Sequence, residues 1–306
     1  MSDPEVLHSV EALRRALEVA RARGRTVGLV PTMGALHAGH ESLIGRAVEE
    51  CDLAAVSIFV NPLQFGDRSD LDRYPRTLSH DLEVCRRLGA GVVFAPSVSE
   101  MYPDWPEPPS TVVSVGPEAE GFEGSSRPGH FDGVATVVAK LFAVAGRCRA
   151  YFGEKDFQQL AVVRTMTADL GFPVEVVACP TVRERDGLAL SSRNVRLSPE
   201  ERRAATVLAR ALSCAAVAMA SGERRPGAVG DLMAAVVATE PLVTLDYGAV
   251  VDAATLRTPG RIDGHRPLRL LIAAEVGGVH LIDNAPVEVG RRAEGVRALA
   301  GAVTGG

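Results

Sequence analysis

The sequence lacks the features of a membrane or secreted protein. No uninterrupted apolar run approaches the roughly 20 residues that a membrane-spanning helix needs. Residues 1–15 carry acids and arginines where a secretory signal peptide has an apolar core. Lys and Arg number 33 against 38 Asp and Glu, so no basic surplus indicates a nucleic-acid partner. We therefore predict a cytoplasmic protein that binds neither membrane nor nucleic acid.

Cysteine is also scarce, and the chain contains only Cys51, Cys85, Cys148, Cys179 and Cys214. They form no CxxC pair and no Cys/His cluster, which excludes the usual zinc spacings and offers no disulfide framework. Four have apolar neighbours and are predicted core residues. Cys148 lies between Arg147 and Arg149, and we expect it to be more reactive than the others.

Several catalytic motifs are missing. The chain has no GxxxxGK[ST], no GxGxxG after its first strand, no GxSxG and no HExxH. A conventional P-loop kinase, Rossmann dehydrogenase, serine hydrolase or zinc protease is therefore disfavoured.

What is present is an alternation of strand and helix patterns. Short buried strands are predicted over residues 26–30, 53–60, 92–94, 150–152 and 174–178. Helices are predicted over residues 6–22, 41–50, 78–88, 131–145 and 157–170. This order indicates the α/β class, with a Rossmann-like, doubly wound parallel sheet covered by helices on both faces.

The alternation breaks between residues 95 and 130, where proline and glycine are frequent. Val112, Val113 and Val115 are candidates for an edge strand there. A loop of this length inside a compact domain is usually functional or mobile.

A second style of sequence begins near residues 181–198. Ser198, Pro199 and Glu201 form a capping-box pattern that predicts a helix start. Alanine-rich helices (residues 204–220 and 231–238) and short strands (residues 245–251, 268–274 and 279–282) follow. We predict a catalytic domain over residues 1–182 and a smaller α+β, lid-like domain over residues 183–306.

The most informative motif is HAGH, residues 37–40, directly after the first strong strand. His37 and His40 are three residues apart, so at a helix start both rings can lie on one face. The helix N-terminus and the histidines together favour phosphate, and open parallel sheets bind ligands at this edge. The alternative is a capped turn without a ligand.

Two further loops could bind phosphate. GEKD, residues 153–156, follows a strand, and Lys155 supplies a point charge. The run from Leu190 to Arg193 (LSSR) combines a charge with two hydroxyls. Each also fits an ordinary polar loop.

Other polar residues carry weaker patterns. Gln64 follows the second predicted strand, where its amide could hold a small polar substrate. Residues 127–133 are either functional or only a helix entry. Asp81 reads as a helix-face carboxylate unless a metal lies nearby.

Taken together, HAGH and the SSR loop resemble the HIGH/KMSKS nucleotidyltransferases. A finer resemblance is to the pantothenate synthetase (pantoate–β-alanine ligase) family. It is carried, in family order, by PTMGALHAGH, FVNPLQFG, YPRTLSHDL, RPGHFDGVATVV, YFGEKDFQQL, PTVRERDGLALSSRN and LIDN, and it runs from about residue 26 to residue 284.

The resemblance implies an AMP-forming ligase that joins pantoate to β-alanine through a pantoyl-adenylate, with ATP and Mg²⁺. By similarity His37 is the acid catalyst, with His40, Lys155 and Arg193 assisting, and Gln64 and Gln159 hold pantoate. Asp81 falls in the region associated with Mg²⁺, and His80 stands where some members carry a carboxylate. The ATP-contacting positions implied are Met33, Gly34, Ala35, Leu36, His37, Ala38, Gly39, His40, Gly153, Glu154, Lys155, Asp156, Val182, Leu190, Ser191, Ser192 and Arg193.

The family resemblance also implies a homodimer. Two alternatives remain at this point: a related nucleotidyltransferase that adenylylates a phosphorylated metabolite, and a nucleotide-binding regulator without catalysis.

Overall fold

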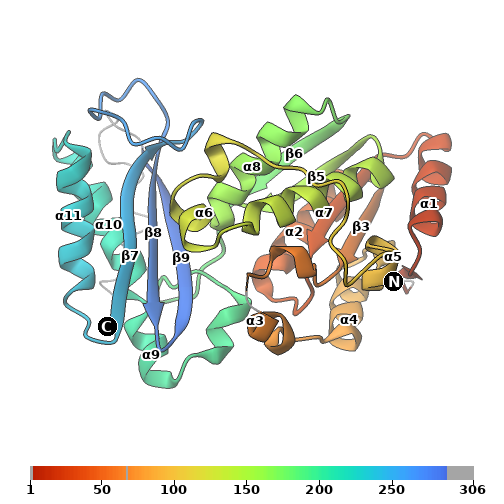
Figure 1. Cartoon of the computed structure of the whole chain (residues 1–306), viewed down its shortest axis with the longest axis horizontal. Helices are drawn as coiled ribbons and strands as arrows, with labels where there is room; N and C mark the ends of the chain where they lie inside the picture. The colour runs from red at the N-terminus through yellow and green to blue at the C-terminus, as the bar shows by residue number, and fades with distance from the viewer. Residues whose placement is uncertain (1–2, 67, 288–306) are drawn as a thin grey trace. The chain divides into compact units, whose positions relative to one another are not determined.

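The structure, a computed structural model, describes residues 3–66 and 68–287. The chain divides into two compact units. Unit 1 comprises Met1–Glu154 and Gln158–Pro180, and unit 2 comprises Lys155–Phe157 and Thr181–Gly306. Each has its own sheet and its own buried core (Figure 1).

Unit 1 is built on a six-stranded sheet whose strands all run parallel. In spatial order the strands are β1 (Glu5–Leu7), β4 (Val92–Phe94), β3 (Leu53–Ile58), β2 (Val27–Thr32), β5 (Cys148–Gly153) and β6 (Val174–Cys179). Parallel strands buried on both faces read as continuous apolar runs, as β2 and β3 do.

The helices of unit 1 connect the strands in two directions. α2 (Ala38–Glu50) and α4 (Leu78–Leu88) lead from β2 to β3 and from β3 to β4. α1 (Val10–Ala22), α7 (His130–Ala145) and α8 (Phe157–Asp169) lead the opposite way. Right-handed crossovers place these two groups on opposite faces, and the direction reverses between β2 and β5. The predicted doubly wound α/β fold is confirmed.

The helices are amphipathic and bury one stripe each. α1 buries Leu13, Leu17 and Ala20, and α2 buries Leu43, Ile44 and Ala47, at the three- and four-residue spacing of a helix face. Unit 1 also contains the short helices α3 (Arg68–Arg73), α5 (Val98–Met101) and α6 (Phe122–Ser126).

Unit 2 is the predicted smaller α+β body. Its antiparallel sheet has the order β7 (Val243–Asp252), β8 (Leu268–Val276) and β9 (Val279–Val287). α10 (Val207–Ala220) and α11 (Pro226–Val237) pack side by side against it (Figure 1). α9 (Pro199–Ala204) starts at Ser198 with the predicted capping box, in which Ser198 and Glu201 each accept the other's backbone N–H.

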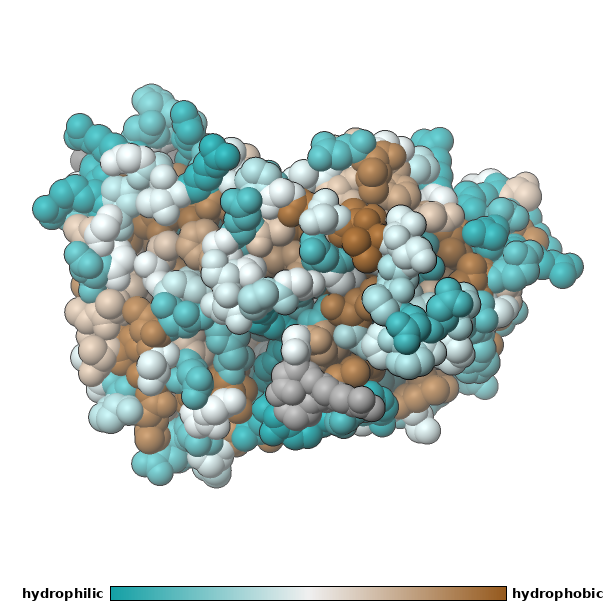
Figure 2. Space-filling view, in the orientation of Figure 1, coloured by the Kyte–Doolittle hydropathy of each residue, from teal (hydrophilic) through white to brown (hydrophobic). Residues whose placement is uncertain are grey.

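One helical stretch, Pro199–Ala220, is long and apolar enough to cross a membrane, and 44% of its most apolar window is buried. Leu208, Ala211 and Leu212 from this stretch are buried in the core of unit 2, as expected for the core helix of a globular unit. In Figure 2 the apolar residues on the visible face lie in separate groups among polar ones.

Three sequence predictions are wrong. Residues 6 and 7, predicted to begin a helix, belong to β1 because residues 5–7 pair with β4, and α1 starts only after the cap Ser9. The segment with Val112 and Val113 forms no strand within the described residues; the Val113 N–H donates to the Thr136 hydroxyl instead. Cys148 is buried, and desolvation raises the pKa of its thiol to about 12, so it is not a reactive thiolate.

Candidate active site

The HAGH segment lies at the carboxyl end of β2, beside the reversal between β2 and β5. α2 begins one residue after His37, whose Nδ1 accepts the Gly39 N–H at 3.1 Å. That bond places the proton of the neutral ring on Nε2. The rings of His37 and His40 lie 4.2 Å apart, centroid to centroid. Two histidines therefore stand together at a helix N-terminus, an arrangement suited to phosphate.

The turn before His37 has an unusual backbone. Gly34 has φ +81° and Ala35 has φ +50°, both in the left-handed region. Consecutive residues of this kind turn successive N–H groups toward one side. The acceptor on that side is Asp81, whose Oδ2 and Oδ1 lie 3.1 Å and 2.8 Å from the nitrogens of Ala35 and Leu36.

These contacts test the expectation that Asp81 is a Mg²⁺ ligand. Both of its oxygens accept backbone N–H groups, and both lie 3.3 Å from the Thr77 hydroxyl. Asp81 borders a cavity of about 330 Å³, yet it is 0% exposed. Mg²⁺ keeps several waters and needs accessible oxygens. The carboxylate does not fit a magnesium ligand.

Gln64 ends the short 3-10 helix η1 (Pro62–Gln64), which follows β3. Its Oε1 accepts from the Asn61 amide at 3.0 Å, and its Nε2 lies 3.1 Å from the Met33 sulfur. Asn61 in turn donates to the Gly133 carbonyl at 3.0 Å and accepts from the Tyr102 hydroxyl at 2.8 Å. The Gln64 amide is thus oriented by a buried network.

Burial maintains this network. Desolvation raises the pKa of Tyr102, so its hydroxyl keeps the proton it donates. Gly133 is required on α7 because a Cβ there would lie 2.4 Å from the Leu63 carbonyl oxygen. The motif at residues 127–133, whose role the sequence left open, also supports Gln64: the His130 Nδ1 lies 2.9 Å from the Gln64 carbonyl oxygen.

The glutamines at the start of α8 differ in their surroundings. Gln159, the predicted pantoate ligand, is half-buried. Gln158, which sequence reasoning passed over, is 5% exposed. Its amide accepts from the Glu123 N–H and donates to carbonyls of Glu118, Glu120 and Gly121. Gln158 therefore anchors the glycine-rich loop. The sequence offered one clue: consecutive residues of a helix face in different directions, so Gln158 and Gln159 have different surroundings.

Most of the remaining predicted residues lie in unit 2. The 3-10 helix η3 (Glu154–Asp156) follows β5 directly, and Lys155 Nζ lies 3.5 Å from Asp156 Oδ1. Val182 and Leu190 pair across a hairpin, with the Leu190 N–H donating to the Val182 carbonyl at 3.0 Å. Leu190 is followed by Ser191, whose side chain caps the 3-10 helix η4 (Ser192–Arg196) and accepts the Arg193 N–H at 3.2 Å.

Two consecutive residues of β9 hold both of these segments. Arg183 of the hairpin forms a bidentate pair with Asp283, at 2.6 and 2.8 Å. The Asn284 amide donates to the Lys155 carbonyl at 2.8 Å, and its Oδ1 accepts from Arg269 at 2.7 Å. Asp283 and Asn284, from the LIDN motif, are functional candidates that sequence reasoning did not single out.

The predicted site residues therefore fall into two groups. Residues 33–40, Gln64, Asp81, Gly153, Glu154 and Gln159 lie in unit 1. Lys155, Asp156, Val182 and residues 190–193 lie in unit 2.

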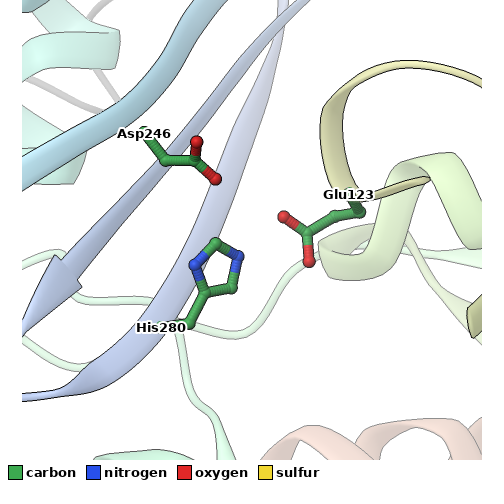
Figure 3. Close-up of side chains that lie close together, drawn as sticks. All are labelled: Glu123, Asp246 and His280. Carbon is green, nitrogen blue, oxygen red and sulfur yellow. The ribbon is translucent and has the colours of Figure 1, made fainter. Parts of the chain in front are cut away.

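Figure 3 shows two polar side chains on the outer strands of the unit 2 sheet. Asp246 lies at an irregularity in β7, and His280 lies on β9, with ligand atoms within 4.8 Å of each other. Glu123, also labelled there, lies on α6 in unit 1. Asp246 and His280 offer two ligand atoms, fewer than a structural or catalytic zinc site uses.

Known proteins resemble this chain over nearly its whole length. The family described as pantoate-beta-alanine ligase matches residues 5–286. A pantothenate synthetase of Rubrobacter xylanophilus is 53% identical over 289 residues, covering 93% of this chain and 99% of that protein. A pantothenate synthetase structure from Thermus thermophilus has a TM-score of 0.85 at 46% identity, covering 93% and 99% of the two chains.

A third relative has a structure with ligands. The pantoate-beta-alanine ligase of Francisella tularensis, complexed with beta-gamma ATP and beta-alanine, has a TM-score of 0.72 at 30% identity. The match covers 92% of this chain and 97% of the Francisella tularensis chain.

Proposed function

Because the chain belongs to the pantoate–β-alanine ligase family, we propose that it is an AMP-forming ligase that condenses (R)-pantoate with β-alanine. ATP is consumed, and the products are pantothenate, AMP and diphosphate. The observation that carries this proposal is the pair His37 and His40 at the N-terminus of α2, at the carboxyl edge of a doubly wound sheet. The relative complexed with beta-gamma ATP and beta-alanine supports ATP and β-alanine as substrates.

The reaction proceeds in two transfers. A pantoate carboxylate oxygen attacks the α-phosphorus of ATP, the bond to the leaving oxygen breaks, and diphosphate departs. The amine of β-alanine then attacks the acyl carbon of pantoyl-adenylate, loses a proton and expels AMP. Neither transfer requires a covalent bond to the protein.

The protein's own groups stabilise the charge that develops. His37 and His40 supply donors at the helix N-terminus, and Lys155 and Arg193 supply cations; such preorganised groups lower the barrier of a phosphoryl transfer. ATP contacts residues 33–40, 153–156, Val182 and 190–193. Gln64 and Gln159 bind pantoate. ATP is used as its Mg²⁺ complex, in which the ion offsets phosphate charge.

We assign residues 1–182 as the catalytic domain and residues 183–306 as a lid-like domain. A hydrolysable acyl-adenylate needs a site closed to water. The chain acts in the cytoplasm as a homodimer. The resemblance to a family of biosynthetic enzymes supports both assignments.

The test is exchange of radiolabelled diphosphate into ATP, with Mg²⁺ but without β-alanine. We expect exchange that requires D-pantoate. The His37→Ala variant should exchange at least about 100-fold more slowly, as loss of a transition-state donor does. The matched control is His265→Ala, which removes an exposed histidine with no assigned role. Absence of exchange, together with absence of AMP release after β-alanine is added, would contradict the proposal.

A further inference from the structure

We propose that Asp81 is a positioning residue that sets the backbone of the loop presenting His37, and that it does not bind Mg²⁺. The catalytic part of this inference rests on the proposed function, whereas the loop contacts do not. Asp81 and the loop are 45 to 46 residues apart in sequence, so the contact exists only in the folded chain.

All the hydrogen-bond partners of the Asp81 carboxylate that are described here are donors of the protein. The Asp81 oxygens receive the N–H groups of Ala35 and Leu36, and both lie within 3.3 Å of the Thr77 hydroxyl. The Asp81 N–H donates to the Thr77 carbonyl at 2.9 Å, which places the carboxylate in the first turn of α4. Hydrogen-bond donors and the positive end of a helix thus stabilise its buried charge, without a metal.

The loop before His37 is shaped to fit the Asp81 carboxylate. Gly34 and Ala35 both have positive φ, which turns their backbone around the carboxylate. A Cβ on Gly34 would lie 2.9 Å from Asp81 Oδ2, so the loop and the carboxylate are in close contact. An L-residue such as Ala35 adopts the left-handed region at a cost, and a buried acceptor for its N–H offsets that cost.

The contacts of Asp81 with the loop also position the residues at the start of α2, Leu36 and His37. Leu36 is 5% exposed and belongs to the cluster that joins α2 to α4. His37 is the N-cap of α2. When Asp81 holds the N–H groups of Ala35 and Leu36, it sets the direction in which the chain enters α2, and therefore the position of the His37 ring.

The decisive variant is Asp81→Asn, which keeps the shape but replaces one acceptor with a donor facing a backbone N–H. In hydrogen-exchange mass spectrometry of the ligand-free protein, we expect peptides covering residues 33–37 to lose protection. In pantoate-dependent exchange we expect kcat to fall about 10- to 100-fold, the effect of losing a hydrogen bond to a charged group. The Mg²⁺ concentration that gives half-maximal rate should not change.

A second variant acts from the other side of the contact. Gly34→Ala puts a methyl group against Asp81 Oδ2 and leaves the carboxylate intact. It should lower protection and kcat in the same way, again without a changed Mg²⁺ requirement. The matched control is Glu83→Gln, an exposed carboxylate on the same helix, which should behave as the unaltered protein.

A raised Mg²⁺ requirement in Asp81→Asn with normal protection of residues 33–37 would overturn the proposal. Normal protection with normal kcat would overturn it equally. If the unaltered protein shows no pantoate-dependent exchange, the proposed function fails, but hydrogen exchange still decides whether Asp81 holds the loop.

Discussion

The amide of Gln64 is oriented before substrate binds. Asn61 donates to its oxygen, and the Tyr102 hydroxyl donates to Asn61 in turn. Preorganisation of this kind reduces the entropy lost on binding. Gln64 is only 8% exposed, so burial also limits the rotation of its amide.

Replacing Gln64 with Ala should raise the KM for pantoate about 10-fold, the value of roughly one hydrogen bond, and leave the KM for ATP nearly unchanged. The measurement is steady-state kinetics with each substrate varied in turn. The Tyr102→Phe variant removes the donor to Asn61 and should shift the pantoate KM in the same direction by less. Equal effects on pantoate and ATP would show that Gln64 has no specific role with pantoate.

Residue-scale inference from sequence succeeds where chemistry is local and fails where it depends on distant partners. The HAGH motif could be placed at a helix start because it directly follows a predicted strand and precedes a predicted helix, and in the structure His37 is the N-cap of α2. The hydrogen bonds of Asp81 and the environment of Cys148 could not be predicted, since both depend on segments far along the chain.

At the scale of elements, β9 acts as the common support for two loops. Its residues Asp283 and Asn284 hold the hairpin through Arg183 and η3 through the Lys155 carbonyl. Asp283 and Asn284 are 4% and 3% exposed, and buried hydrogen bonds are costly to leave unmade.

The Asn284→Asp variant should raise the KM for ATP about 10-fold. It keeps an acceptor for Arg269, but it sets a carboxylate oxygen against the Lys155 carbonyl, so η3 loses its anchor. The loss of one net hydrogen bond corresponds to roughly this factor. Glu275→Gln, an exposed change on the neighbouring strand β8, serves as the control. If the KM for ATP and kcat stayed unchanged, Asn284 would have no role in ATP binding.

Two elements of unit 1 were predictable to the residue. The bounds of α4 and β4 match the sequence prediction at both ends. β1 was not predicted because Val6 and Leu7 continue the apolar spacing of α1, and only pairing with β4 makes residues 5–7 a strand. The valines near residue 113 have strand propensity but bond to a side chain on α7 instead.

At the scale of the whole molecule, each unit has its own hydrophobic core. The chain's single tryptophan, Trp105, lies in unit 1. Its fluorescence therefore reports on unit 1, whereas far-UV circular dichroism reports on both units. Multidomain proteins commonly depart from two-state unfolding, so both probes are needed for any measurement of stability.

Carboxylates in both units have pKa values below their usual range. Hydrogen bonds from Thr26 lower the pKa of Asp52 in unit 1. In unit 2, Arg202 lowers the pKa of Asp186, and Arg225 lowers the pKa of Glu223 to about 2. A depressed folded-state pKa means that the unfolded chain binds more protons, so stability rises with pH in this range. The contribution is complete above about pH 5 and is lost as pH falls toward 2.

The melting temperature should therefore be nearly constant from pH 7 to about 5 and fall steeply between about pH 4 and 2.

The Arg202→Gln variant isolates one part of this effect, since Arg202 forms a bidentate pair with Asp186 at 2.8 and 3.1 Å between α9 and the hairpin. The Arg202 and Asp186 side chains are 27% and 48% exposed, and partly exposed ion pairs are worth little, so the variant should lose only about 0.5 kcal/mol at pH 7. That difference should shrink as pH falls toward 2, because protonation of Asp186 removes the charge that pairs with Arg202. Urea unfolding followed by circular dichroism at the two pH values measures it. A difference that persists unchanged at pH 2 would show that Arg202 stabilises unit 2 by packing rather than through its charge.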